Sequence, residues 1–469
     1  MTNTKKIATN TIVQIIGKVI TTAISVIMLA YLARYLGVAG YGDYTTVFAF
    51  LGFFAIVADM GFYTVAVKEM ARNPERSPDI MGNIFSIRII FALFFLFLAP
   101  LVGHFIPVYN EGVKIGLWVG TLSSFFILLN QLTVGIFQVH LRMERLVISD
   151  VVSRIVLFVL TMVFIKLNMS LGLFIFANVV SNLCLFGFSL IMSRKFLKFS
   201  LKFDKTYIGR IIREALPLGI IIVLGLIYFK IDTVMLSIMK DSEAVGIYGA
   251  PYKVLEIFIT VPSMFMGSVF PLISKYFHEK DIRLKDSFHK SFDFISMMAL
   301  PILFGVFVLA KPITVLVLGS EFLNSTTVLQ YLIFAVFIIF YGTIMGNFII
   351  AADLQKKLLW IYLASVIVNI TGNLILIPHY SYIGSSISTI FTESLVCLSA
   401  YLIVYNKLGF VPRFNTFAKA LLSSMLMAIA VYFMRGFSIF ITIPMGILIY
   451  SIVLFSVGGI NKEMIKKVL

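Results

Sequence analysis

The chain has 469 residues, of which 60% are hydrophobic and 13% charged, and its formal net charge is +16. Soluble globular chains contain about 45–50% apolar and about 25% charged residues, so this composition excludes an ordinary soluble protein and places the chain in a membrane. Two cysteines, Cys184 and Cys397, lie in apolar stretches. They form neither a disulfide framework nor a metal-ligand pattern, and we expect them to pack as small apolar side chains.

Apolar stretches long enough for a transmembrane helix, which needs about 20 residues, recur along the whole chain. Taken in order, they centre near residues 22, 55, 95, 126, 156, 181, 226, 261, 302, 338, 367, 394, 425 and 448. The first stretch follows the basic opening MTNTKK without a small-residue cleavage site, so it is predicted to be a retained helix and not a signal peptide. The sequence therefore predicts about fourteen transmembrane helices.

Basic residues collect in alternate loops between these predicted helices. In one set of loops they are Lys5, Lys6; Lys68, Arg72, Arg76; Arg142, Arg145; Arg194, Lys195, Lys198, Lys202, Lys205, Arg210, Arg213; Lys275, Lys280, Arg283, Lys285, Lys290; Lys356, Lys357; Lys407, Arg413, Lys419; and Lys462, Lys466, Lys467. The opposite loops hold only Arg34, Lys114, Lys166, Lys240 and Arg435. The positive-inside rule then predicts that both termini are cytoplasmic. Topology and anionic lipid explain the positive charge, so no nucleic-acid partner is expected.

The predicted outer loops are all short, which limits the function classes. Membrane glycan polymerases and ligases usually carry a sizeable outer loop with catalytic groups, and this chain has room for none. It also contains neither a G-x-x-x-x-G-K-[ST] phosphate loop nor an H-E-x-x-H motif, and its five histidines are scattered singly. We therefore expect a transporter without catalytic residues, metal or cofactor, and keep a membrane glycan polymerase or ligase as an alternative.

Two pairs of similar segments indicate an internal repeat. GVAGYGDY (37–44) matches AVGIYGAPY (244–252), and NMSLGLFIFANVVSN (168–182) matches HYSYIGSSISTIFTES (379–394), at offsets of roughly 210 residues. The predicted fold is an all-α polytopic membrane protein with two pseudo-symmetric six-helix lobes. The predicted divisions are residues 1–195 for the first lobe, 196–213 for a cytoplasmic linker, 214–408 for the second lobe, and 409–469 for two appended helices and a cytoplasmic tail.

Several segments resemble the prokaryotic polysaccharide flippases of O-antigen and teichoic-acid type, in the multidrug/oligosaccharidyl-lipid/polysaccharide exporter superfamily. They include YLARYLGVAGYGDYTTVFAFLGFFAIVADMGF (31–62), VKEMARN (67–73), EALPLGIIIVLGLIYFKIDTVMLSIM (214–239) and NITGNLILIPHYSYIGSSIST (369–389). The resemblance implies two lobes around a central cavity. It also implies alternating access that moves a polyprenyl-pyrophosphate-linked oligosaccharide from the cytoplasmic to the outer leaflet of a prokaryotic membrane. Its partners would be that substrate, membrane lipids and glycan polymerases or glycosyltransferases. A multidrug or cation extruder of the same superfamily is an alternative.

Charged residues inside the predicted second lobe form the first candidate site. Lys230 and Asp232 are two positions apart, which separates them by about 200° around a helix, so neither is the other's main partner. Lys253 should lie at a depth similar to Lys230, and Glu256 can pair with it at i,i+3. We expect one cluster of these four residues. It either holds two helices together or lines the cavity and contacts sugar or pyrophosphate.

Charged residues of the predicted first lobe lean basic. Lys18, Arg88 and Arg154 lie in the inner half of the membrane with one acid, Asp59, and Asp150 can pair with Arg154 at i,i+4. Arg88 has no local partner in the sequence. Arginine binds phosphates by a bidentate fork and lysine as a point charge. We therefore hypothesise that the three cations form an inner site for pyrophosphate.

Glu393 stands near the middle of the twelfth predicted helix, with no basic residue within four positions. Burial of a carboxyl group favours its protonated form. Glu393 is therefore a candidate for coupling transport to H⁺ or Na⁺, as is Asp59; the alternative is a protonated acid bonded to a neighbouring helix.

Overall fold

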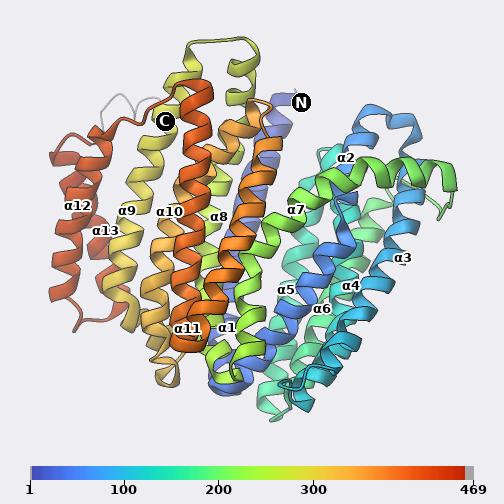
Figure 1. Cartoon of the computed structure of the whole chain (residues 1–469), viewed down its shortest axis with the longest axis horizontal. Coiled ribbons are helices and arrows are strands. Elements are labelled where there is room, and N and C mark those ends of the chain that lie inside the picture. Colours follow the sequence, from blue (N-terminus) through green and yellow to red (C-terminus); the bar gives the residue numbers. More distant parts are fainter. Residues whose placement is uncertain (1–2, 460–469) are drawn as a thin grey trace. The chain divides into compact units, whose positions relative to one another are not determined.

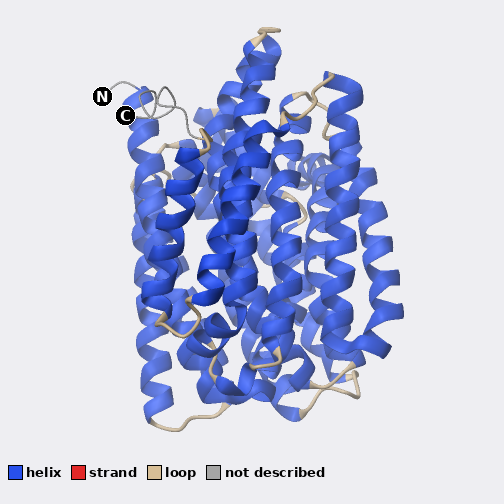
Figure 2. Ribbon diagram, turned by 90° about the vertical axis from the view of Figure 1, so that its left-hand side faces the viewer, coloured by secondary structure: helices blue, strands red, loops and turns tan. Residues whose placement is uncertain are grey.

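The computed structural model describes residues 3–459, which Figure 1 traces in chain order. Within this range every regular element is a helix, and Figure 2 shows only helices and loops. The main helices are α1 (Asn3–Asp59), α2 (Phe62–Arg72), α3 (Ser77–His104), α4 (Glu111–Val139), α5 (Met143–Lys166), α6 (Leu171–Ser193), α7 (Lys205–Met239), α8 (Ser242–His278), α9 (Arg283–Val317), α10 (Ser325–Ala351), α11 (Lys356–Leu408), α12 (Phe414–Phe433) and α13 (Ile439–Ser456). The predicted all-α class is confirmed. The predicted basic tail with Lys462, Lys466 and Lys467 lies outside the described residues.

Twelve helical segments of the described chain are long and apolar enough to cross a membrane. Two of them contain a sharp turn, at Gly37 in α1 (φ 67°) and at Ser381 in α11 (φ 51°). The 53 residues of α11 would extend about 80 Å as one straight helix, far more than the roughly 30 Å of a hydrocarbon core. Each turn therefore divides its helix into two crossings, which accounts for the fourteen predicted helices.

The chain divides into two compact units, Met1–Gly246 and Ile247–Leu469. Helix α7 belongs to the first unit because it packs against α1, α2 and α3. Residues 205–213, which the sequence assigned to a linker, form the first turns of α7. The division into lobes at residues 195, 213 and 408 stays a prediction.

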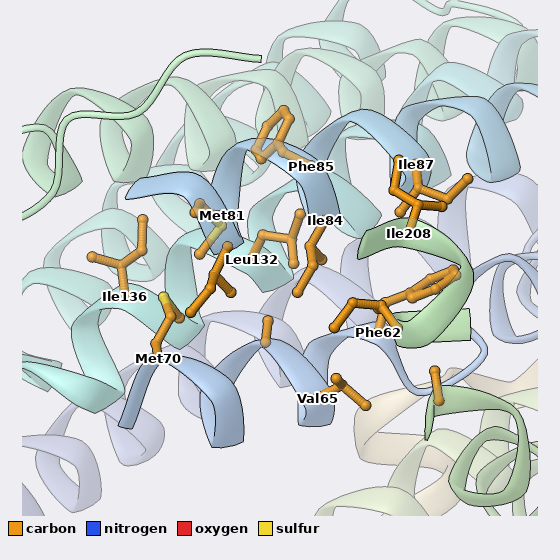
Figure 3. Packing of buried hydrophobic residues seen from close by; sticks show 14 of the residues in the cluster. Phe62, Val65, Met70, Met81, Ile84, Phe85, Ile87, Leu132, Ile136 and Ile208 are labelled. Atoms are coloured by element: carbon orange, nitrogen blue, oxygen red, sulfur yellow. The ribbon is translucent and has the colours of Figure 1, made fainter. Parts of the chain in front are cut away.

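One apolar core of the first unit lies where α2, α3, α4 and the start of α7 meet, and Figure 3 shows it. Helix α2 contributes Phe62, Val65, Ala66 and Met70, spaced so that they share one helical face. Ile208 of α7 packs among them. Burial of each large apolar side chain contributes about 1.5–3 kcal/mol, so this core fixes the short amphipathic helix α2 and the first half of α7 together.

Within the first unit, close backbone contacts at two glycines join α1 to the start of α8. A Cβ on Gly42 would lie 1.7 Å from the carbonyl oxygen of Ser242, and a Cβ on Gly246 would lie 2.0 Å from that of Val38. The Asp43 carboxylate also accepts a hydrogen bond from the Ser242 hydroxyl. Only glycine allows two backbones to approach so closely, so these positions lock the turn of α1 to the α7–α8 hairpin.

In the second unit, the helices nearest the carboxyl end form a core with α9. Met427 of α12 and Leu454 of α13 are buried beside Leu300 of α9. The Tyr450 hydroxyl of α13 donates a hydrogen bond of 2.7 Å to the Met297 carbonyl of α9. Helix α9 therefore anchors the pair α12–α13.

Candidate functional site

A buried ion pair joins three helices of the first unit. The Arg88 side chain of α3 is fully buried, forms an ion pair with Asp59 at the end of α1, and donates a hydrogen bond to Gln131 of α4. The sequence offers Arg88 no local partner, and the structure supplies one 29 positions away on another helix. Because a fully buried arginine here contacts a partly buried carboxylate and an amide from two other helices, the pair ties α1, α3 and α4 together.

The chain breaks its helix directly beside this ion pair. Met60 and Gly61 have positive φ values of 40° and 81°, which end α1 after Asp59 and let α2 begin at Phe62. A Cβ on Gly219 of α7 would lie 2.4 Å from the Met60 carbonyl oxygen, so α7 covers the break. Three features therefore converge: a helix break, a buried charge pair and a close backbone contact.

Two of the Arg88 nitrogens, Nε and Nη1, are buried without a hydrogen-bond partner among the described residues. A buried unsatisfied donor costs about 1–3 kcal/mol, so such groups usually meet water or a ligand. Arg88 can contact a substrate directly only if its surroundings open, because its side chain is 0% exposed.

The other two cations of the predicted inner site lie along α1 and α5. Lys18 is exposed, and its neighbour Gly17 packs against Val147 of α5. Arg154 lies seven residues beyond Val147, about 10 Å further along α5. Its Nε is 3.6 Å from Asp150 Oδ1, which confirms the predicted i,i+4 pair. Lys18, Arg88 and Arg154 share no acceptor among the described residues, so a common pyrophosphate site for all three stays a prediction.

Lys230 and Asp232 lie in the segment FKIDTVML (229–236) of α7, in the first unit. The Asp232 side chain is 1% exposed, whereas Lys230 is half-buried with its Nζ 5.6 Å from the centre of the Phe229 ring. Their different exposure agrees with the prediction that they point to different sides of the helix.

Lys253 and Glu256 lie in α8, in the part that belongs to the second unit. The Lys253 ammonium is 2.9 Å from Glu256 Oε2, which confirms the predicted i,i+3 pair. The predicted cluster of these two residues with Lys230 and Asp232, and its contact with sugar or pyrophosphate, stays a prediction.

Glu393 is buried in α11, with 5% of its surface exposed. Three uncharged side chains near Glu393, which we call the polar ladder, are hydrogen-bonded to one another. Thr392 is adjacent to Glu393 in the sequence, and Asn369 and Asn373 lie in the other half of α11, before the turn at Ser381. Asn369 Nδ2 donates to Thr392 Oγ1 at 3.3 Å, and Asn373 Nδ2 donates to Asn369 Oδ1 at 2.9 Å. This polar ladder lines the contact between the two halves of α11 with oxygen atoms, which suits a proton or a small hard cation.

Gln131, Asn369, Asn373 and Thr392 were not predicted as site residues. Each is uncharged, so a search for charges inside apolar stretches passes over it. For Asn369 and Asn373 a signal exists, because two asparagines at i,i+4 within an apolar helix share one face. Gln131 has no comparable signal.

Comparison with known proteins matches residues 7–277 to the family model described as "Polysaccharide biosynthesis protein". The matched curated relatives include two from Haloferax volcanii. They are "Probable flippase AglR", 21% identical with 52% of this chain and 53% of the relative aligned, and "Probable low-salt glycan biosynthesis flippase Agl15", 23% identical with 48% and 50% aligned. The chain thus spans about half the length of these relatives.

Solved structures share the fold at low sequence identity. "Lipid II flippase MurJ, inward closed conformation" superposes with a TM-score of 0.78 at 16% identity, covering 95% of this chain and 98% of that one. An inward-facing multidrug resistance MATE family transporter of the MOP superfamily gives a TM-score of 0.66 at 14% identity, covering 83% and 95%.

Proposed function

Because the chain belongs to the polysaccharide biosynthesis protein family, we propose that it is a flippase for a lipid-linked glycan. The matched family model covers residues 7–277, more than half of the chain, and this observation carries the proposal. The substrate we propose is an oligosaccharide on a polyprenyl pyrophosphate. It would be moved from the cytoplasmic to the outer leaflet by alternating access, for surface polysaccharide biosynthesis.

The setting follows from the basic loops. The protein would lie in the cytoplasmic membrane of a prokaryote with both termini in the cytoplasm, consistent with the alternation of basic loops. Glycosyltransferases would supply its substrate and a glycan polymerase would consume the product. We infer these partners because a lipid-linked glycan must be synthesised before transport and is consumed after it.

Lys18 and Arg154 are the residues we propose for first contact with pyrophosphate. Lys18 is exposed, and the Arg154 side chain is 42% exposed, so both can reach a ligand without rearrangement of the core. Arginine and lysine both bind phosphate oxygens strongly. Arg88 would join them only when its pair with Asp59 opens.

Reconstitution in liposomes tests the function. We expect the protein to accelerate leaflet exchange of a fluorescent lipid-linked oligosaccharide, measured by protection from an external glycosidase or quencher. Lys18→Gln should slow the exchange. Lys166→Gln is the control: Lys166 is the last residue of α5, outside the proposed pyrophosphate site, so this variant should exchange near the wild-type rate. Exchange no faster than in empty liposomes would refute the proposal.

The multidrug or cation extruder is kept as a second candidate because MATE transporters share the fold. The same liposomes, loaded with a cationic dye, separate the two. Dye extrusion without glycan exchange would favour the extruder.

We further propose that Glu393 couples transport to H⁺ or Na⁺ through the polar ladder of α11. The burial of Glu393 and the oxygen atoms of Asn369 and Thr392 support this. Glu393→Gln keeps the size but not the charge, so we expect exchange to lose its dependence on a proton or sodium gradient. Undiminished gradient dependence would exclude Glu393 from coupling. Asp59 is the second candidate, tested by Asp59→Asn.

A further inference from the structure

A polar pocket of about 360 Å³ lies at the cytoplasmic end predicted for the first unit, where α3 and α7 begin. Its lining residues are Arg76, Asp79, Asn83, Lys202, Phe203, Asp204 and Tyr207. None of them belongs to the sites described above.

Backbone contacts hold the walls of this pocket in place. A Cβ on Gly82 of α3 would lie 2.2 Å from the Ser200 carbonyl oxygen, so the loop before α7 runs directly against α3. The Lys202 amide donates to the Gly82 carbonyl at 3.3 Å, and the Asp204 amide donates to Asn83 Oδ1 at 2.7 Å. The pocket is therefore a built feature of the fold.

Both carboxylates of the pocket already have partners. Asp79 forms an ion pair with Lys202. Asp204 caps α7 by accepting hydrogen bonds from the amides of Thr206 and Tyr207 at 2.9 and 3.1 Å. Arg76, by contrast, is exposed and forms no ion pair within residues 3–459. The uncommitted groups of the pocket are thus mainly donors, led by the Arg76 guanidinium.

Tyr207 adds a second donor. Its hydroxyl is buried and has no hydrogen-bond acceptor among the described residues. Arg210 lies over its ring at 4.9 Å and is itself held 3.2 Å from Glu69 of α2, which fixes the ring. Burial and the nearby Glu69 carboxylate raise the pKa of Tyr207, so the hydroxyl keeps its proton at neutral pH.

The depth of the pocket indicates the kind of ligand. Asp79 lies 25 residues from His104 at the other end of α3, about 37 Å along the helix. A hydrocarbon core is about 30 Å thick, and the bilayer with headgroups about 40–45 Å. With the His104 end of α3 at the opposite edge of the hydrocarbon core, this length places the pocket at headgroup level. Residues 194–213 around it carry Arg194, Lys195, Lys198, Lys202, Lys205, Arg210 and Arg213 against one acid, Asp204.

We propose that this pocket binds the phosphate of an anionic phospholipid in the leaflet that the basic loops predict to be cytoplasmic. The Arg76 guanidinium and the Tyr207 hydroxyl donate to phosphate oxygens, and the basic residues of 194–213 attract the anionic headgroup to the pocket. The pocket shares no residue with the sites proposed for transport, so its lipid binding is tested independently of the flippase function.

Native mass spectrometry of the detergent-solubilised protein tests the site with phosphatidylglycerol as the probe. We expect Arg76→Gln to weaken the tightest phosphatidylglycerol binding about tenfold, because one charge-assisted contact is lost. Tyr207→Phe should weaken it several-fold without lowering the melting temperature, because the lost hydroxyl has no acceptor among the described residues. Arg72→Gln is the matched control: it removes one exposed charge nearby but outside the pocket, and should change binding less than about twofold.

Equal weakening by Arg76→Gln and Arg72→Gln would overturn the proposal, because it would mean general electrostatic attraction. Equal binding of phosphatidylglycerol and the zwitterionic phosphatidylcholine by the wild type would do the same. Inorganic phosphate or pyrophosphate at millimolar concentration should not displace the lipid. Displacement that depends on Arg76 would assign the pocket to a soluble phosphate and overturn the lipid assignment.

Discussion

Two Arg–Asp pairs in the first unit have the same chemistry and opposite surroundings. Arg88 and Asp59 join α3 to α1, and the arginine is 0% exposed. Arg154 and Asp150 lie one turn apart on α5 with side chains 42% and 35% exposed. Removing one partner of a buried pair leaves an uncompensated charge, whereas an exposed pair contributes little because solvent screens it. Burial, and not the residue types, therefore sets what each pair contributes to stability.

The largest effect should follow from removing the buried arginine alone. Arg88→Gln leaves Asp59 charged and partly buried beside a broken helix, so we expect the free energy of unfolding to fall by about 3–5 kcal/mol. The fall would be measured as a lower melting temperature in detergent. Equal lowering of the melting temperature by Arg88→Gln and Arg154→Gln would show that burial does not set the contribution of each pair.

An intermediate effect should follow from removing both buried charges. The variant Asp59→Asn with Arg88→Gln has no unpaired charge, and two amides can still bond to one another and to Gln131. We expect it to be more stable than the sum of the two single changes predicts, by about 1–3 kcal/mol. Additive losses, measured in the same double-mutant cycle, would show that Arg88 and Asp59 act independently.

The smallest effect should follow from the exposed pair. Arg154→Gln should lower the free energy of unfolding by no more than about 1 kcal/mol, and the difference should shrink further in about 1 M salt. Its effect on glycan exchange is expected to be larger than its effect on stability, because we propose that Arg154 contacts pyrophosphate. A stable variant with wild-type exchange would remove Arg154 from the substrate site.

The helices and the local ion pairs could be predicted from the sequence because their signals are local. An apolar stretch of about 20 residues predicts a membrane-spanning helix without any information from the rest of the chain. Asp150 and Arg154, like Lys253 and Glu256, lie within four residues, so helical spacing alone brings them together, and the structure confirms both pairs.

The rest of the candidate site could not be predicted because its contacts join distant parts of the chain. Asp59 meets Arg88 only once α1 and α3 pack, and Gln131 arrives from α4. The polar ladder of α11 needs the turn at Ser381 to bring Thr392 back to Asn369. One sequence, read without its tertiary packing, holds no signal for such pairings.

The close contacts of Gly42 and Gly246 between α1 and the α7–α8 hairpin can form only late in synthesis of the chain. The Asp43–Ser242 bond joins residues 199 positions apart. At a synthesis rate of about 5–20 residues per second, the outer end of the second crossing would wait roughly 10–40 s in the membrane before its partner emerges. During that interval Gly42 and Asp43 lack their contacts with Ser242. Factors that assist membrane insertion would therefore encounter the segment around Gly42 exposed at first, and covered by the start of α8 only after residue 242 is inserted.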